Sequence, residues 1–427
     1  MNSSVSPSLI IAFTVAALTG CGPTSDDMIP DDVIEEPAAA SSPFLYVWAG
    51  ADAEDDSDFL AVIDADPQSE SYGAIVASVA VGVNGHAHHS EHVMPAGDSL
   101  FVNSFRDGSS FVIDLSDPMR PRVANSFRAM GDYTYPHTFE RLPNGHVLAT
   151  FQTKGEGNET AGGLVELDPA GNFVRAADAA DPADPEIRAY SVTPIPKLDR
   201  AVSTTTDMWA KANGTSFQVW RLSDLTLLKT VVLSPGERGY EHRDPAEVRL
   251  LADSVTAMMT TFTCAMYRLH DLDSDEPRAE LVNVLPWADY ETDACGIPAT
   301  TGHIWLQTYA NSNGSALISL DITDPSSPTV LDELRWDEAW SPHWISIEPG
   351  GRRVVLTSGE GATQYRVLVI DLDPETGALA FDTTFRDRET GEVGVSFDRS
   401  SWPHGAAGAA KPHGAVFSGA AREEGRP

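Results

Sequence analysis

The sequence predicts an all-β fold of the seven-bladed β-propeller class, and three observations support this prediction. Short β-branched runs recur between turn residues, and no amphipathic segment with a helical period has a convincing length. An apolar run that ends in a polar residue and a turn occurs seven times at a spacing near 50 residues. The first repeat lacks one strand that the end of the chain can supply, which would close a ring.

The regular spacing of the repeats is the strongest of these observations. The seven runs are separated by 50, 52, 55, 47, 53 and 50 residues. A propeller blade has this period, because each blade is a four-stranded sheet that needs neighbours to bury its faces. An open sandwich or two separate β domains are the alternatives. The runs are Val62-Ile63-Asp64, Val112-Ile113-Asp114, Leu164-Val165-Glu166, Val219-Trp220-Arg221, Met266-Tyr267-Arg268, Ser319-Leu320-Asp321 and Val369-Ile370-Asp371.

Within each period we expect an inner strand, a second strand, the third strand that carries the run, and an outer strand. Residues 99–105 and 353–358 are examples of second strands, and residues 122–127 are an example of an outer strand. Turns such as Asp117-Pro118 and Asp324-Pro325 separate the third strand from the outer strand, where turns with proline are favoured.

The two ends of the repeat region complement each other. The first repeat, residues 43–79, supplies a second, a third and an outer strand but no inner strand. Residues 411–418 resemble the inner strands of other blades, so we expect the last blade to be closed by this C-terminal strand joining the three N-terminal strands. The propeller is therefore predicted to span residues 43–418, and a disordered tail to span residues 419–427.

The N-terminal part of the sequence predicts an export signal followed by a tether. Residues 1–20 carry no charged side chain, and their apolar run, residues 9–18, is too short to cross a bilayer. Leu18-Thr19-Gly20-Cys21 then predicts a lipoprotein signal peptide, with Cys21 as the lipidated residue. An uncleaved or ordinary signal peptide is the alternative. Residues 21–42 are acidic and form a flexible tether, which places the protein on the bacterial cell envelope, at the periplasmic face or the cell surface.

The net charge and the missing motifs exclude several function classes. A formal charge of −35 repels phosphate backbones and anionic lipid headgroups, so we expect no nucleic-acid partner and no polybasic membrane docking. No G-x-S-x-G, H-E-x-x-H or G-K-[ST] motif occurs. The simplest hydrolase, metalloprotease and nucleotide-binding interpretations are therefore disfavoured.

Histidines recur at one repeat-equivalent position. When the starts of the seven inner strands are aligned, four of them carry histidine: His89, His137, His343 and His413. Inner strands line the axis of a propeller and begin at the same face, so these side chains should converge at one mouth of the channel. Imidazole is the commonest protein ligand for transition metals, which predicts a metal site, with His88 as a further ligand. The alternative is that these histidines serve only axial packing and hydrogen bonding.

Three other residues are expected to complete the ring: Tyr190, Glu247 and Cys295. Glu247 or Tyr190 could handle protons as catalytic groups. Cys264 is expected at the same face as Cys295, and a disulfide between them is the preferred prediction in an oxidising compartment. Independent thiols, or a metal thiolate at Cys295, are the alternatives.

These motifs resemble the selenium-binding protein and methanethiol oxidase family. The resemblance rests on His88-His89, Tyr135-Pro136-His137-Thr138, Gly162-Gly163-Leu164-Val165 and the histidine of the last inner strand, and it is closer still to bacterial exported relatives. It implies a seven-bladed propeller and copper-dependent oxidation of a small thiol by dioxygen. It also implies His88, His89, His137 and His413 as metal ligands, to which the repeat alignment adds His343.

Two family features are absent, and two other functions stay open. The cysteine-rich segment after the paired histidines is missing, so the resemblance does not extend to selenium binding through cysteine. His413-Gly414 replaces the usual His-Glu, so the resemblance supports the metal ligands more strongly than the family's substrate. Carotenoid cleavage oxygenases are also seven-bladed propellers with four axial histidines, which hold iron. A non-catalytic binding or scaffold propeller of the cell envelope is the second alternative.

Overall fold

The computed structural model of the chain describes residues 41–155, 160–209, 212–285, 295–311, 314–336, 341–358 and 365–419. The predicted signal peptide, Cys21, nearly all of the tether and the tail beyond residue 419 lie outside the described residues. In the described part the only helical element is a 3₁₀ turn, η1 (Pro196–Leu198), and the rest of the regular structure is β-strand. No helix in this part is long and apolar enough to span a membrane.

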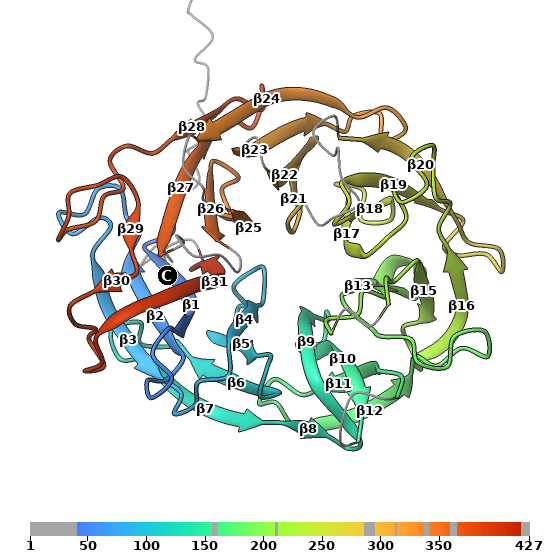
Figure 1. The fold of residues 1–427 in the computed structure, drawn as a ribbon, viewed down its shortest axis with the longest axis horizontal. Helices are drawn as coiled ribbons and strands as arrows, with labels where there is room; N and C mark the ends of the chain where they lie inside the picture. Colours follow the sequence, from blue (N-terminus) through green and yellow to red (C-terminus); the bar gives the residue numbers. More distant parts are fainter. Residues whose placement is uncertain are drawn as a thin grey trace, which may run out of the picture. The chain divides into compact units, whose positions relative to one another are not determined.

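The strands form seven sheets that follow one another around a common centre (Figure 1). This arrangement is the predicted seven-bladed propeller. Six of the sheets are built from consecutive strands, and their inner strands lie nearest the centre (Figure 1). The inner strands are β4 (Ala87–Ser90), β9 (Tyr133–Arg141), β13 (Val192–Ile195), β17 (Pro245–Leu250), β21 (Ala299–Thr301), β25 (Pro342–Ile347) and β31 (Gly408–Phe417).

The other strands follow the predicted order within each blade. The second strands are β1 (Phe44–Ala51), β5 (Ser99–Ser104), β10 (Val147–Lys154), β14 (Arg200–Thr204), β18 (Ala257–Thr261), β22 (Ile304–Asn311) and β26 (Arg353–Ser358). The third strands are β2 (Phe59–Asp64), β6 (Ser109–Asp114), β11 (Gly163–Leu167), β15 (Ser216–Arg221), β19 (Ala265–His270), β23 (Gly314–Asp321) and β27 (Arg366–Leu372). Each third strand contains one of the seven runs.

Outer strands complete the blades: β3 (Ile75–Ala80), β7 (Arg122–Phe127), β12 (Phe173–Asp178), β16 (Thr226–Val232), β20 (Arg278–Val284), β24 (Thr329–Trp336) and β28 (Leu379–Phe381). Three short strands extend the sheets: β8 (Ala129–Met130) beside β9, β29 (Val395–Ser396) beside β27, and β30 (Asp398–Arg399) beside β31.

The C-terminal strand closes the ring. β31 pairs antiparallel with β1, so that Leu45 lies opposite Phe417 and Val47 lies opposite Ala415. The first sheet therefore has the order β3-β2-β1-β31-β30, which is the pairing that the sequence predicted. This pairing covers the edge of β1 that would otherwise be free to pair with another chain.

Two inner strands begin later than the alignment predicted: β13 starts after Tyr190, and β21 starts after Cys295. Tyr190 N–H donates to Thr204 O at 2.8 Å, and the Ser191 N–H donates to the hydroxyl oxygen of Thr204 at 3.2 Å. Cys295 keeps a single bridge to Tyr309. Both residues therefore hold their inner position through individual contacts rather than through a continuous ladder.

Buried tryptophans tie neighbouring blades together. Trp48 and Trp344 are fully buried, and each indole N–H donates to a backbone carbonyl of the next sheet. The acceptors are Asn103 O at 2.7 Å for Trp48 and Ala415 O at 2.8 Å for Trp344. A buried indole needs such a partner, so these contacts fix the ring orientation as well as the spacing between blades.

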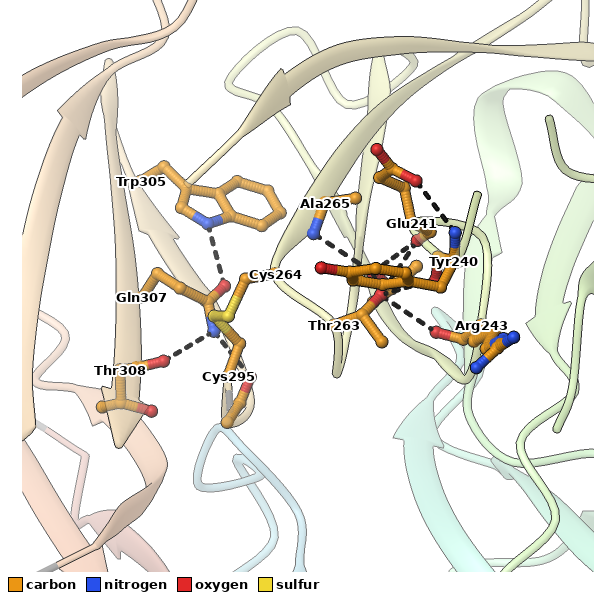
Figure 2. Close-up of a disulfide and its surroundings, with 12 residues drawn as sticks. Tyr240, Glu241, Arg243, Thr263, Cys264, Ala265, Cys295, Trp305, Gln307 and Thr308 are labelled. Atoms are coloured by element: carbon orange, nitrogen blue, oxygen red, sulfur yellow. Dashed lines mark hydrogen bonds between the residues drawn. A yellow bond between two sulfur atoms is a disulfide. The ribbon is translucent and has the colours of Figure 1, made fainter. Parts of the chain in front are cut away.

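A disulfide joins two further blades (Figure 2). Cys264, directly before β19, is bonded to Cys295, with a Cα–Cα distance of 5.2 Å. The Cys295 N–H donates to Phe262 O at 3.1 Å, and Ile297 N–H donates to His343 O at 2.8 Å. The bridge therefore anchors a segment whose backbone also holds the inner strand that carries His343.

Replacing both cysteines by serine is expected to lower the free energy of unfolding by about 3–4 kcal/mol, because the bridge closes a loop with a sequence separation of 31 residues. The urea unfolding midpoints of the wild-type protein and the double variant measure this difference. A reductant should lower the wild-type midpoint toward that of the variant and leave the variant unchanged. Equal midpoints without reductant would contradict the prediction.

Candidate metal centre

Five imidazoles come together near the start of the inner strands. His88 and His89 lie on β4, His137 on β9, His343 on β25 and His413 on β31. In two triads, one ring nitrogen or the other of each residue lies within 4.8 Å of the rest: His88, His89 and His137, and His89, His343 and His413. Because His89 belongs to both triads, the five rings form one cluster, which we call the histidine centre.

A backbone carbonyl fixes the orientation of His137. Its Nδ1 lies 2.9 Å from Tyr190 O, so Nδ1 carries the proton and donates, and Nε2 keeps its lone pair. Nε2 of His88 lies 3.0 Å from Nε2 of His137. Two nitrogens bound to one ion at about 2.0 Å and at roughly right angles would be about 3 Å apart. The observed spacing fits a hydrogen bond between the two rings and would also fit a shared ion.

Several ring nitrogens of the centre are buried without a hydrogen-bond partner among the described residues. They are Nδ1 of His88, both ring nitrogens of His89, and Nδ1 of His413. Buried polar atoms are nearly always satisfied, so unpaired nitrogens gathered in one place indicate a missing partner. A transition-metal ion that prefers nitrogen ligands would satisfy them, and the residues present therefore fit such an ion.

Four of the five imidazoles are held neutral, those of His88, His89, His137 and His413. Burial, followed by the proximity of the other rings, keeps the pKa of His88, His89 and His413 well below the usual range. Burial also lowers the pKa of His137 to about 4, although the hydrogen bond to Tyr190 opposes this shift. At neutral pH these rings are in the unprotonated form that binds a metal.

Aromatic side chains enclose the centre. The Trp344 ring lies 5.0 Å from the His89 ring, and the Phe105 ring lies 5.7 Å from the rings of both His88 and His137. Asn103 connects the two strands that carry these histidines. It accepts from the His89 N–H at 2.7 Å and donates to Pro136 O at 2.7 Å.

A cavity of about 310 Å³ opens beside the centre and is lined by His86, Arg106, Lys411 and His413, among others. His86 and the nearby Tyr135 both have left-handed backbone conformations, with φ of 66° and 58°. Such values are costly for bulky residues and persist only where the surroundings impose them. Since His413 lines the cavity, the cavity reaches the histidine centre, and the ring of His86, another lining residue, lies 6.2 Å from the His88 ring.

The three residues expected to complete the ring have different positions. The Tyr190 ring lies 4.1 Å from the His137 ring and belongs to the centre. The sulfur of Cys295 is bonded to Cys264 and offers no thiolate. Glu247 lies in contact with His92 and Arg249 instead. Ala246 is the residue equivalent to His137, because each directly follows a proline that pairs with the second strand of its blade.

Glu247, His92 and Arg249 form a buried charged cluster. Glu247 Oε2 lies 3.1 Å from His92 Nε2 and also pairs with Arg249. Burial opposes ionisation of Glu247, but Arg249 and His92 outweigh it and lower its pKa to about 2. The His92 ring stacks on Trp344 at 4.0 Å, so the cluster is connected to the histidine centre through one aromatic ring. Glu247 therefore provides a fixed negative charge at neutral pH.

Three residues of this region were not identified from the sequence: His86, Trp344 and Arg249. Each stands close to a residue that was identified. His86 lies two positions before His88, Trp344 follows His343, and Arg249 lies two positions after Glu247, which places both on the same side of β17. Of the three residues, Arg249 could most easily have been identified from the sequence, because residues two apart on a strand face the same side.

Comparisons with known proteins agree with the resemblance seen in the sequence. The chain is 32% identical over 139 residues to a methanethiol oxidase of Hyphomicrobium, which covers 30% of this chain and 32% of the relative. It is 26% identical over 305 residues to a methanethiol oxidase of Ruegeria pomeroyi, which covers 68% of this chain and 64% of the relative. The matches thus span about a third and just under two thirds of these curated relatives. No family model matches the chain.

Among solved structures, a hypothetical selenium-binding protein from Sulfolobus tokodaii has the same fold. The TM-score is 0.70 at 17% identity, over 90% of this chain and 95% of that chain. At this identity the similarity establishes the fold alone. Together, the sequence matches and this fold confirm the resemblance to the selenium-binding protein and methanethiol oxidase family.

Proposed function

We propose that this protein is a metal-dependent oxidase of a small thiol and that its metal is copper. The observation that carries the proposal is the histidine centre, in which five imidazoles converge and several of their ring nitrogens have no partner among the described residues. The sequence similarity to two methanethiol oxidases supports a thiol as the substrate. Imidazole nitrogen suits copper, and iron is the alternative metal.

In this proposal His88, His89, His137, His343 and His413 hold the ion. When bound, copper supplies the one-electron chemistry with dioxygen that protein side chains lack. The carbonyl of Tyr190 keeps His137 in the required tautomer, and Asn103 holds the backbones that carry His89 and His137 in place.

The cavity beside the centre would admit the substrate. Phe105, Tyr135 and Trp209 form an aromatic group at this end, with ring distances of 5.1 Å between Phe105 and Trp209 and 4.9 Å between Tyr135 and Trp209. Phe105 packs against the rings of His88 and His137, so this aromatic group would shield the centre from water and favour a small apolar alkyl group there. Of the two residues that were predicted to transfer protons, Glu247 is assigned the role of a fixed negative charge instead. A role of Tyr190 in proton transfer stays a prediction.

Oxygen consumption by the copper-loaded protein tests this proposal. Methanethiol and ethanethiol should each stimulate oxygen uptake, and dimethyl sulfide, which has no S–H group, should not. Elemental analysis of protein isolated from its own host distinguishes copper from iron. Complete inertness of the copper-loaded protein toward simple thiols would remove the enzyme proposal, and a metal-free native protein would favour a scaffold.

We further propose that the chain is exported and lipid-anchored through Cys21. The motif Leu18-Thr19-Gly20-Cys21 motivates this proposal, and the disulfide supports it, since disulfides persist in oxidising compartments. Mass spectrometry of the mature N-terminus tests it. An acylated Cys21 is expected, and an intact Met1 would contradict the proposal.

A further inference from the structure

A second cavity lies toward the carboxyl ends of the inner strands, away from the starts of the strands where the histidine centre lies. Its volume is about 580 Å³, which is within the usual range of small-molecule sites. Five different inner strands each contribute at least one polar side chain to its wall, among them Glu140, Thr193, Arg249, Thr300 and Ser346. Apolar side chains, including Leu142, Pro143 and Val248, form much of the remaining wall.

The cations in the wall of this cavity are already paired. Arg141 donates to both carboxylate oxygens of Glu91, at 2.6 Å from Nε and 3.1 Å from Nη2. Arg249 pairs with Glu247, and its Nε donates to Pro298 O at 2.9 Å. The guanidinium groups are therefore committed to internal partners, and they do not prepare the cavity for an anion.

One ionisable group in the wall makes no direct ion pair among the described residues. The carboxyl group of Glu140 lines the cavity, and among the described residues it has no hydrogen bond and no ion pair. Burial is the main cause that raises its pKa to about 8. The positive charge of Arg249 opposes this shift, and the nearby carboxylates of Glu247 and Glu91 add to it. Arg249 is already paired with Glu247, so among the described residues an ionised Glu140 has no cation in direct contact with it.

The hydroxyl groups of the wall offer acceptors. Thr193 Oγ1 donates its proton to Val248 O at 2.8 Å, and Ser346 Oγ donates its proton to His92 O at 2.9 Å. Since each hydroxyl has one proton and two lone pairs, both oxygens retain the capacity to accept. The hydrogen bonds that the cavity can still make to a ligand are therefore mostly ones in which the ligand donates.

We propose that this cavity binds a small primary amine in its protonated form, with the carboxylate of Glu140 as the counter-ion and the hydroxyls of Thr193 and Ser346 as acceptors. A primary ammonium group carries one positive charge and three N–H donors, which match this set. Its alkyl part would pack on Leu142, Pro143 and Val248. A quaternary ammonium group has no donor, and a carboxylate has the wrong charge.

Titration calorimetry with n-butylamine at about pH 8 tests the proposal. The protein is used without metal, because amine nitrogen can also bind a metal ion. Butylamine should bind at one site, and tetramethylammonium and butyrate should bind at least about tenfold more weakly. The Glu140→Gln variant, which keeps the size of the side chain, should bind butylamine at least about tenfold more weakly. The measurement needs neither copper nor turnover, so it stands apart from the oxidase proposal.

Two further variants and a proton count sharpen the test. Thr193→Val should weaken binding several-fold, and Glu276→Gln, which removes an exposed carboxylate outside the cavity, should leave it unchanged. Below about pH 8, binding should release up to one proton as Glu140 ionises, so the heat should depend on the buffer, and this dependence should vanish in Glu140→Gln. Equal affinity of the wild-type and Glu140→Gln proteins, or no binding at millimolar butylamine, would overturn the proposal.

Discussion

Replacing His89 by alanine is expected to remove most of the copper from the reconstituted protein and to reduce thiol-dependent oxygen uptake at least about 100-fold. His89 belongs to both triads of the histidine centre and is fully buried. Its loss therefore weakens every coordination set that the five rings can form. Copper per protein after dialysis and the rate at an oxygen electrode measure the two effects. His137→Ala should act similarly, because Tyr190 orients its Nε2 toward the other rings.

A matched control separates loss of a ligand from loss of any histidine. His146 pairs with Glu166 at 2.7 Å on β11 and lies outside the centre. His146→Ala should retain both copper and oxygen uptake. Full copper content and full activity in His89→Ala would show that the histidine centre is not the metal site, whereas copper loss in His146→Ala as well would indicate general unfolding.

The propeller could be predicted because each blade repeats the same local chemistry. The third strands carry one recurring pattern, and residues 411–418 match the inner strand that the first repeat lacks. Because seven repeats share the pattern, it can still be recognised where single blades are irregular, as at the late starts of β13 and β21. The convergence of His89, His137 and His413 followed from the same register, because equivalent positions of a ring become neighbours.

The second cavity could not be predicted in this way. Glu140, Thr193, Arg249 and Ser346 are four different residue types, so no repeated letter marks their common position. The contacts near this cavity join side chains from opposite parts of the ring. Glu247 and His92, for example, are in contact although they are distant in the sequence. The sequence placed Glu247 in the histidine ring, but the contacts with Arg249 and His92 place it in another cluster. Whether side chains of different blades form an ion pair depends on their lengths and rotamers, and the strand register does not determine these.

Glu247→Ala is expected to lower the free energy of unfolding by about 3–5 kcal/mol, because it leaves the charge of Arg249 largely buried without its partner. The Arg249 side chain is only 14% exposed and that of Glu247 is fully buried. Urea unfolding at about pH 7 measures the loss. Replacing both residues by leucine should restore much of the stability, since no unpaired charge is then buried. A Glu247→Ala protein with the wild-type midpoint would contradict this account.

The effect of this variant should also depend on pH with a defined sign. The pKa of Glu247 is lowered from 4.5 to about 2 in the folded protein, so its contribution is fully present above about pH 5 and is lost as the pH falls toward 2. The difference in stability between the wild-type and Glu247→Ala proteins should therefore shrink across this window. Parallel stability curves from pH 7 down to the acid limit would mean that Glu247 acts by packing alone, since packing does not titrate.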